Sequence, residues 1–340
     1  THYLVYQGEL IMQKVTQRIV FIADWQDEKK QSDSLYDGTR ECPNAFYYQT
    51  VLHGLKSICD CVICYHDVEQ FIENIANHKS DIVVSLWSGQ KDRNRKCFIP
   101  AICESYHIHY IGADAFVQSL CQNKHLSKIY ANSFGIKSAA DLNITMREQI
   151  PLCKELKFPV IVKPNSEGGS NGISDYSLAM NYPTAYNMVE NLYGVFNRDI
   201  LVEEYIEGKE LTIIIANMPD GHLFWSEQIL AIDGKTDFKS EIYGYETKKL
   251  HKRKTSREIV NLISSEEKKK IQNLFLALGK VDYMRIDGRF NGNHFYLIEL
   301  SPDANLSPKS SMGFAFQSHG YSYNDMLYSL IQGAINQFRY

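Results

Sequence analysis

A glycine-rich segment in the middle of the chain places the strongest constraint on the fold. It spans Phe158–Ile173 and reads FPVIVKPNSEGGSNGI, so an apolar, β-branched run carries Lys163 directly into a loop. The loop contains Gly168, Gly169, Ser170 and Gly172. Because glycine has no Cβ, successive N–H groups can line an anion site, to which the lysine adds a positive charge. The segment predicts a strand followed by a phosphate-binding loop, and a turn that binds nothing is the simpler alternative.

The length and charge of the chain exclude several classes of protein. Its 340 residues suffice for two or three domains with a large core. The formal net charge of -4 argues against a nucleic-acid partner. No apolar run reaches the roughly 20 residues that span a bilayer, and the first residues lack the order of a signal peptide. We therefore expect a cytoplasmic protein with no membrane partner.

All eight cysteines lie in the first half of the chain. The cluster CDCVIC, from Cys59 to Cys64, could indicate a metal site. However, it lies in an apolar, β-branched stretch, where Cys59 and Cys61 would share one face of a strand. We expect buried thiols that pack as small apolar side chains, without disulfides in a reducing compartment.

From Arg18 onward, strand-like and helix-like segments alternate. Strands are expected at residues 18–25, 57–65 and 81–87, and helices at 44–58 and 66–80. This order predicts parallel strands joined by crossover helices, a Rossmann-like layer with its ligands beyond the carboxyl ends of the strands. Residues 1–17 precede the first strand as an extension or a swapped segment.

Two loops, Asp24–Glu28 and Trp87–Lys96, fall at that edge of the sheet. The second reads WSGQKDRNRK and is strongly basic. A solvated charged loop explains such a run equally well. In the functional interpretation it forms a collar for an anionic or carboxylate-bearing substrate.

The rest of the chain predicts mixed α/β structure. Helices are expected at residues 116–134, 179–197 and 265–279, and strands at 199–205, 211–218 and 222–230, the last two as a hairpin. The first of these helices carries Lys124 and Lys128 on one face. Residues 236–254 are polar, rich in tyrosine and without a period, which is typical of an active-site lid.

A closing hairpin concentrates charge at residues 281–300. Alternation places Arg285, Asp287 and Arg289 on one strand face, with Glu299 on the partner strand. Facing carboxylates favour a divalent cation, and Mg²⁺ typically takes one or two of them plus substrate phosphates. A structural network of arginine and carboxylates is the alternative. Upstream, the turn in LVEEYIEGKEL could offer backbone groups to adenine and Glu210 to ribose.

Four motifs follow one another as VIVKPNSEGGSNGI, LVEEYIEGKELT, YGYETKK and RIDGR…YLIEL. This order resembles the ATP-grasp superfamily, and most closely its D-alanine–D-alanine ligase branch, from about Tyr110 to the C-terminus. The resemblance implies an α/β and α+β fold. A Rossmann-like preATP-grasp domain (1–112) would precede two α+β lobes, 113–199 and 200–340, that enclose ATP.

The same resemblance implies roles for individual residues. Arg285, Lys248 and Ser310 would be catalytic, and Asp287, Glu299 and Ser301 would hold Mg²⁺. The residues on ATP would be Lys124, Lys163, Glu167, Gly168, Gly169, Ser170, Glu203, Glu204, Ile206 and Glu210. The residues on the substrates would be Trp87, Arg93, Arg95, Tyr243, Tyr245 and Ser311.

The chain departs from that branch on the substrate side. Ser301 stands where the branch has a metal-binding asparagine, so Asp303 or Asn305 could complete the site instead. The glutamate-bearing loop that captures an ammonium in the branch is replaced by ADWQDEKKQ. Trp87 and KDRNRK replace a histidine and an acidic loop, and Lys249 replaces an aromatic residue. We therefore predict that the substrate is not D-alanine.

The predicted activity is an ATP-dependent, ADP-forming ligation of a carboxylate to an amine through an acyl phosphate. The partners would be small-molecule carboxylate and amine substrates, such as amino acids or an amino acid and a related acid. The sequence leaves open whether the chain forms a homodimer. It also leaves open two other functions: an ATP-binding regulatory protein with weakened catalysis, and an ATP-grasp enzyme that passes the acyl phosphate to a non-amine nucleophile.

Overall fold

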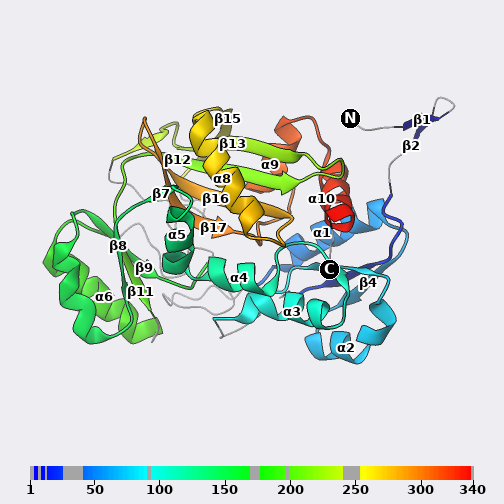
Figure 1. Cartoon of the computed structure of the whole chain (residues 1–340), viewed down its shortest axis with the longest axis horizontal. Coiled ribbons are helices and arrows are strands. Elements are labelled where there is room, and N and C mark those ends of the chain that lie inside the picture. Colours follow the sequence, from blue (N-terminus) through cyan, green and yellow to red (C-terminus); the bar gives the residue numbers. More distant parts are fainter. Residues whose placement is uncertain are drawn as a thin grey trace.

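The structure is a computed structural model that describes residues 14–25, 41–89, 93–168, 177–196, 199–239 and 253–337. It also describes two short strands nearer the N-terminus, β1 (Leu4–Tyr6) and β2 (Glu9–Ile11), which pair antiparallel. The predicted mixture of α/β and α+β structure is confirmed, because a parallel sheet precedes sheets built mainly of antiparallel strands. Figure 1 shows these sheets side by side along the long axis of the molecule.

The N-terminal layer is a parallel sheet in the order β4-β3-β5-β6. Its strands are β3 (Ile19–Ile22), β4 (Val62–Tyr65), β5 (Ile82–Ser85) and β6 (His109–Tyr110). The helices that follow them are α1 (Ala45–Ile58), α2 (Val68–Glu73) and α3 (Phe98–Ser105). The side chain of Asn44 caps α1 by accepting the N–H of Tyr47. The Rossmann-like layer is thus confirmed.

The cysteine cluster differs from its prediction. Helix α1 continues to Ile58 and Cys59 is its C-cap, so Cys59 does not share a strand face with Cys61. The helical period of the preceding residues outweighs the β-branched character of the cluster. The thiols are free, but Cys61 is exposed rather than buried. Among the described residues, no three His, Cys, Asp or Glu side chains are grouped as a metal site.

The second sheet is antiparallel, in the order β10-β9-β11-β8. Its strands are β8 (Asp141–Ile144), β9 (Val160–Pro164), β10 (Leu178–Ala179) and β11 (Ile200–Glu204). Helix α6 (Tyr182–Phe196) covers one face, at the left of Figure 1. Since β11 pairs with β8 and β9, this sheet extends to Glu204, beyond the predicted lobe boundary at residue 199.

The third sheet has the order β15-β13-β12-β16-β17-β7, with β14 paired to β12. Its strands are β7 (Lys137–Ser138), β12 (Gly208–Asn217), β13 (Leu223–Ile232), β14 (Asp237–Phe238), β15 (Thr255–Val260), β16 (Tyr283–Phe290) and β17 (Phe295–Ser301). The predicted hairpins at β12–β13 and β16–β17 are confirmed. Helices α8 (Ser265–Ala277), α9 (Ser311–Ser318) and α10 (Tyr323–Gln337) pack beside it.

The helix predicted at residues 116–134 is two helices, α4 (Ala115–Gln122) and α5 (Lys124–Asn132). Asn123 between them has an extended backbone, and its side chain accepts the N–H of Leu126. An asparagine that caps the backbone locally competes with a continuous helix. The break makes Lys124 the first residue of α5 and directs that helix toward β17.

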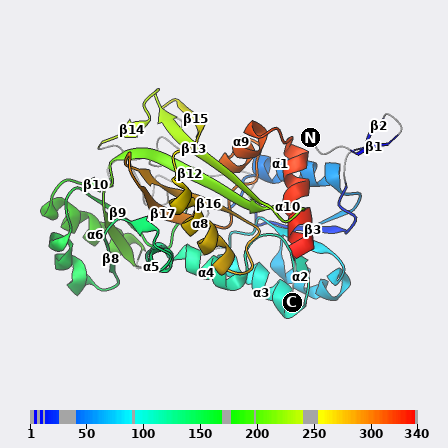
Figure 2. The same cartoon turned by 45° about the horizontal axis from the view of Figure 1, so that its top comes forward.

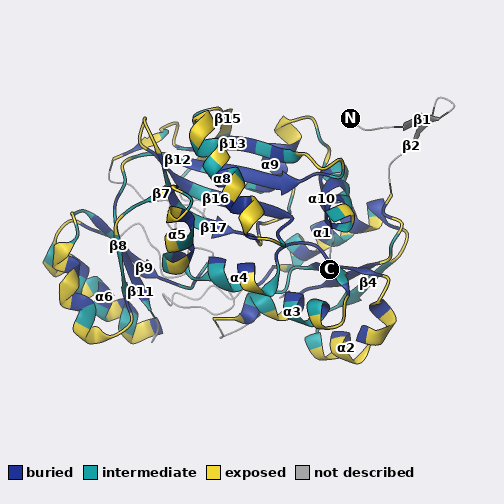
Figure 3. Cartoon of the chain, in the orientation of Figure 1, coloured by how far each residue is buried: buried dark blue, intermediate teal, exposed yellow. Residues whose placement is uncertain are grey.

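The core joins parts of the chain that lie far apart in sequence. Apolar residues of α1 and β3 pack with those of α9 and α10 in one cluster. Figure 2 shows α10 beside α1, and Figure 3 shows that the sheet strands are buried while the outer surfaces of α2 and α6 are exposed. In the described part of the chain, no helix has the length and apolarity needed to cross a membrane.

Candidate active site

Two cavities meet at the edge of the third sheet. The larger, of about 540 Å³, lies between the second and third sheets. The smaller, of about 260 Å³, lies between the N-terminal layer, α4 and the end of β17. Arg285, Glu299 and Asn305 line both cavities. The two spaces therefore share one charged boundary.

Buried lysines surround one carboxylate beside the larger cavity. Lys163 of β9 pairs with Glu203 of β11 because these strands are neighbours in the second sheet. Lys128 of α5 reaches the same carboxylate at 2.7 Å and also lies 2.5 Å from Asp141. Each of the three residues Lys128, Lys163 and Glu203 is at most 3% exposed. A buried cluster with two ammonium groups around one carboxylate is suited to exchange that carboxylate for a phosphate.

The pKa values of this cluster follow from burial and charge. Burial opposes ionisation of Glu203, but Lys128 and Lys163 outweigh it and lower the carboxyl pKa to about 2. Burial also disfavours the charged form of Lys163, and its pKa is lowered despite the pairing with Glu203, since Lys128 and Lys124 repel it. The pKa of Lys128 is raised because two carboxylates together outweigh its burial.

Lys124 lines the smaller cavity and pairs with Glu299, which lines both cavities. Its ammonium lies 3.0 Å from Glu299 Oε1 and donates a hydrogen bond to the backbone carbonyl of Glu167. The break between α4 and α5 produces this placement. The predicted phosphate ligands Lys124 and Lys163 thus lie on opposite sides of the shared boundary, each paired with a carboxylate.

The carboxylates predicted to bind metal face each other across neighbouring strands. Asp287 is opposite Glu299 in the β16–β17 ladder, and both line the larger cavity. Arg285 donates to Asp287 at 2.7 Å and to the hydroxyl of Ser301 at 3.1 Å. The hydroxyl of Thr212 donates to the second oxygen of Asp287 at 2.8 Å. Burial alone would lower the pKa of Arg285, but Asp287 and Glu299 raise it, so the guanidinium stays charged.

This pair of carboxylates fits Mg²⁺. Hard oxygen ligands on adjacent strands, next to a cavity with room for phosphates, are what that ion typically uses. Ser301 accepts from Arg285, Asp303 pairs with Lys96 at 2.6 Å, and Asn305 accepts the N–H of Ser307. Asp287 and Glu299 line the larger cavity from adjacent strands, so they are the residues that would hold the ion, in exchange for their present partners Arg285 and Lys124.

The residues predicted for the nucleoside also line the larger cavity. Glu204, Ile206 and Glu210 belong to the turn from β11 into β12 and to β12 itself. Glu210 pairs with Arg289 at 2.7 Å, and Arg289 lies over the ring of Tyr205 at 5.1 Å. The carboxylate of Glu203 points instead to the lysines, so in this structure only its backbone remains for an adenine contact.

Ser310 and Ser311 begin helix α9 at the wall of the larger cavity. The Ser310 hydroxyl accepts the N–H of Gly313 at 3.0 Å and donates to the carbonyl of Ser307 at 2.7 Å. This hydroxyl is a helix cap, and a catalytic role would require it to leave that position.

Two residues of the predicted basic collar, Arg95 and Lys96, form ion pairs within the protein. Arg95 lies 2.6 Å from Glu41 and 3.6 Å from Glu167, and Lys96 lies 2.5 Å from Glu41. Trp87 lines the smaller cavity, whereas Arg93 is exposed and is absent from the lining of both cavities. The backbone N–H of Gly168 donates to Glu41 at 2.6 Å, which joins the glycine-rich loop to the N-terminal layer.

Five predicted site residues lie outside the described residues. They are Gly169, Ser170, Tyr243, Tyr245 and Lys248. The predictions for them stay predictions, as does the predicted lid that contains the last three.

A family model described as D-ala D-ala ligase C-terminus matches residues 132–332, which is more than half of the chain. The chain belongs to this family of ATP-grasp ligases. A D-alanine–D-alanine ligase of Pediococcus pentosaceus is 26% identical over 291 residues, covering 81% of this chain and 78% of the relative. The predicted membership of the D-alanine–D-alanine ligase branch is thus confirmed.

Solved structures of the D-alanine–D-alanine ligase fold match almost the whole chain. The ligase from Bacillus anthracis complexed with ATP matches with a TM-score of 0.69 at 17% identity, covering 94% of this chain and 98% of that one. D-alanyl-alanine synthetase A from Vibrio cholerae also has a TM-score of 0.69, at 16% identity, covering 96% and 99%. These matches confirm the ATP-grasp fold.

Within this ATP-grasp ligase, sequence reasoning did not identify Glu41 and Lys128 as members of the candidate site. No motif in the sequence marks Glu41, although its place three residues before the cap Asn44 puts it near the start of α1. Lys96, the last residue of the predicted collar, lines the smaller cavity, but its partners are Glu41 and Asp303 of this chain. Lys128 was placed on the same helix face as Lys124, but no pattern in the sequence identified its partners.

Proposed function

We propose that this member of the family is an ADP-forming ligase that joins a carboxylic acid to an amine. The observation that carries the proposal is that Arg285 and Glu299 line both cavities. A nucleotide in the larger cavity and an acid in the smaller would meet at these two residues. Phosphoryl transfer needs mainly position and compensating charge, which such a boundary supplies.

The larger cavity is the proposed ATP site. Ile206 and the neighbouring backbone would contact adenine, and Glu210 the ribose. Lys124 and Lys163 would exchange their carboxylate partners for phosphate oxygens. Asp287 and Glu299 would hold Mg²⁺, which when bound supplies positive charge to the phosphates.

The smaller cavity is the proposed acid site. A carboxylate there would attack the terminal phosphorus and break its bond to the bridging oxygen, which leaves with ADP. The amine would then attack the acyl carbon and release phosphate. Arg285 is placed to compensate the charge on the transferred group and on the oxygen that becomes negative during amine attack.

We also propose that the acid is not D-alanine, although the named relatives are D-alanine–D-alanine ligases. The support is the position of Lys96, whose ammonium group pairs with Glu41 and Asp303 at the wall of the smaller cavity. A site for D-alanine has to accommodate an ammonium group, and that corner already contains one.

An ADP-release screen tests the proposed function. The purified chain is given Mg-ATP, a panel of carboxylic acids, and hydroxylamine as a general amine that traps an acyl phosphate as a hydroxamate. Acid-dependent formation of ADP and hydroxamate in equal amounts is the expected result. ATP binding without ADP release for any acid would contradict the proposal and favour a regulatory nucleotide-binding role.

A further inference from the structure

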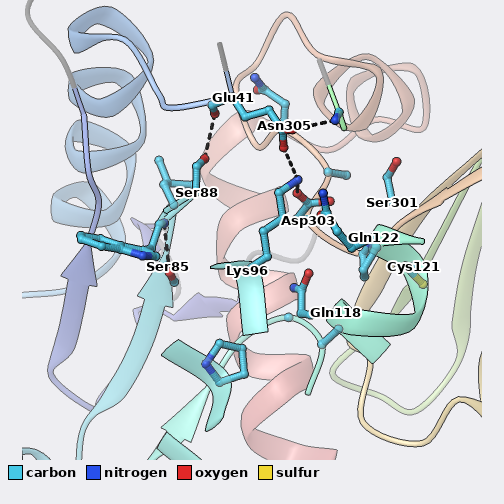
Figure 4. Close-up of a pocket in the computed structure, with 18 of the residues that line it drawn as sticks. Glu41, Ser85, Ser88, Lys96, Gln118, Cys121, Gln122, Ser301, Asp303 and Asn305 are labelled. Carbon is cyan, nitrogen blue, oxygen red and sulfur yellow. Dashed lines mark hydrogen bonds and ion pairs between the residues drawn. The ribbon is translucent and has the colours of Figure 1, made fainter. Parts of the chain in front are cut away.

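The smaller cavity contains an internal ammonium group. Lys96 lies 2.5 Å from Glu41 Oε2 and 2.6 Å from Asp303 Oδ2, and its side chain is 14% exposed. Figure 4 shows Lys96 extending across the pocket toward Asp303, with Gln118 and Gln122 nearby. The Lys96–Asp303 pair joins the N-terminal layer to the segment that follows β17.

Glu41 has little capacity for another cation. Its Oε1 accepts from Arg95 and from the N–H of Gly168, each at 2.6 Å, and its Oε2 faces Lys96. Burial opposes its ionisation, but Lys96 and Arg95 lower its carboxyl pKa to about 2. The carboxylate is therefore charged at neutral pH, and its charge is already compensated within the protein.

The other carboxylates on this cavity are compensated too. Asp303 pairs with Lys96, and Glu299 pairs with Lys124. Among the described residues, every carboxylate that lines the smaller cavity thus has a cationic partner. The remaining polar lining includes the neutral side chains Ser85, Ser88, Gln118 and Gln122. An ammonium group on a ligand would therefore leave water without finding an uncompensated carboxylate in the described lining, a costly arrangement in a partly desolvated site.

We propose that the acid substrate has an uncharged polar group, such as a hydroxyl or keto group, where an amino acid has its α-ammonium. This inference rests on the proposed function, because it assigns the acid to the smaller cavity. The carboxylate would face Arg285. The neutral group would hydrogen-bond to Lys96 or to an amide of α4. The substrate class is therefore a small 2-hydroxy or 2-oxo acid.

The wild-type chain provides the first test. Acids are compared in matched pairs that differ only at the α substituent: lactate against alanine, glycolate against glycine, and malate against aspartate, each chiral acid in both configurations. With Mg-ATP and hydroxylamine, kcat/KM for hydroxamate formation should be higher for the hydroxy acid by about tenfold or more, because an ammonium group would be desolvated there without a carboxylate partner. Equal or higher values for the amino acids would overturn this inference and leave the proposed function intact. No turnover with any acid would overturn both.

Substitution of Lys96 provides the second test. Lys96→Met frees Asp303 and one oxygen of Glu41, so the preference should shift toward amino acids by about tenfold or more. Lys96→Arg keeps the positive charge and should keep the preference for hydroxy acids. Thermal melting shows whether each variant is folded, and if Lys96→Met does not fold, Lys96→Gln replaces it. A folded, uncharged variant with an unchanged preference would overturn the role of Lys96.

Discussion

Asp287 and Glu299 lie directly opposite each other in the β16–β17 ladder, and the register shifts immediately after them, between Asp287 and Gly288. Before the shift, Arg285 is opposite Ser301, and after it Gly288 is opposite Leu297. A bulge of this kind is common near active sites because it redirects side chains and ends regular pairing. Here it follows the two carboxylates that are proposed to hold Mg²⁺.

Replacing Glu299 separates the metal role from a structural one. Glu299→Gln keeps the shape of the side chain but removes a charged ligand, so apparent Mg²⁺ affinity in the ADP-release assay should fall by at least about tenfold. The stabilisation of the chain by Mg-ATP in thermal melting should fall with it. Glu266→Gln, on the exposed face of α8, is the matched control and should change neither. A loss of melting temperature with unchanged Mg²⁺ dependence would favour a purely structural ion pair with Lys124.

Lys128 should contribute to the stability of the folded chain as well as to ATP binding. Lys128→Met fills a similar volume but removes the buried cation that Glu203 and Asp141 share. Breaking a buried ion pair in this way typically costs about 3–5 kcal/mol. Urea unfolding should detect the loss. Lys270→Ala breaks the surface pair with Glu266 and should cost less than about 1 kcal/mol. Equal losses for the two variants would contradict the buried network.

Gly288 should tolerate no side chain. A Cβ at this position would lie 2.3 Å from the ring of Phe295 and 2.4 Å from the carbonyl oxygen of Tyr296. Gly288→Ala should therefore destabilise the β16–β17 hairpin and displace Asp287, lowering both the melting temperature and the affinity for Mg-ATP. In Gly194→Ala, within α6, the added Cβ meets nothing within 4 Å, and helix propensity should stabilise the chain by up to about 1 kcal/mol. A Gly288→Ala variant as stable as wild type would show that the hairpin can rearrange.

Stability should fall in acid through the buried carboxylates Glu203 and Glu41. Each has its pKa lowered from 4.5 to about 2 in the folded state, after burial is outweighed by paired cations. A lowered folded-state pKa means that the unfolded chain binds the proton more readily. The stabilisation is therefore complete above pH 4.5 and is lost as the pH falls toward 2. Urea unfolding at pH 7, 5 and 3 should give a weaker pH dependence for Glu203→Gln than for wild type, and parallel curves would contradict the assignment.

The residues of the proposed ATP site have local signals in the sequence. A β-branched run that ends in a lysine forms β9. Alternation alone placed Arg285 and Asp287 on one face of β16, and the NGN turn brought Glu299 opposite. The length of a continuous helix was less predictable, because a single cap at Asn123 divided the expected helix 116–134.

The substrate side could not be predicted in the same way. The basic run at residues 87–96 has the same composition whether its charges face solvent, a ligand or the protein itself. Where the charges of Arg95 and Lys96 point depends on Glu41 and on Asp303, and Asp303 lies 207 residues from Lys96 in sequence. No periodic pattern encodes a pairing over that separation.

The sequence by itself determined the family, the order of the elements and the residues that are proposed to face a nucleotide, because strand alternation and glycine content act over a few neighbouring positions. Only the tertiary structure decided which cations are already paired. Ion pairing depends on distances of a few ångströms between the N-terminal layer and the third sheet, and those distances exist only after the sheets have packed. The glycine-rich loop therefore predicted a phosphate site, whereas the pairing of Lys96 with Glu41 and Asp303 defined the proposed acid.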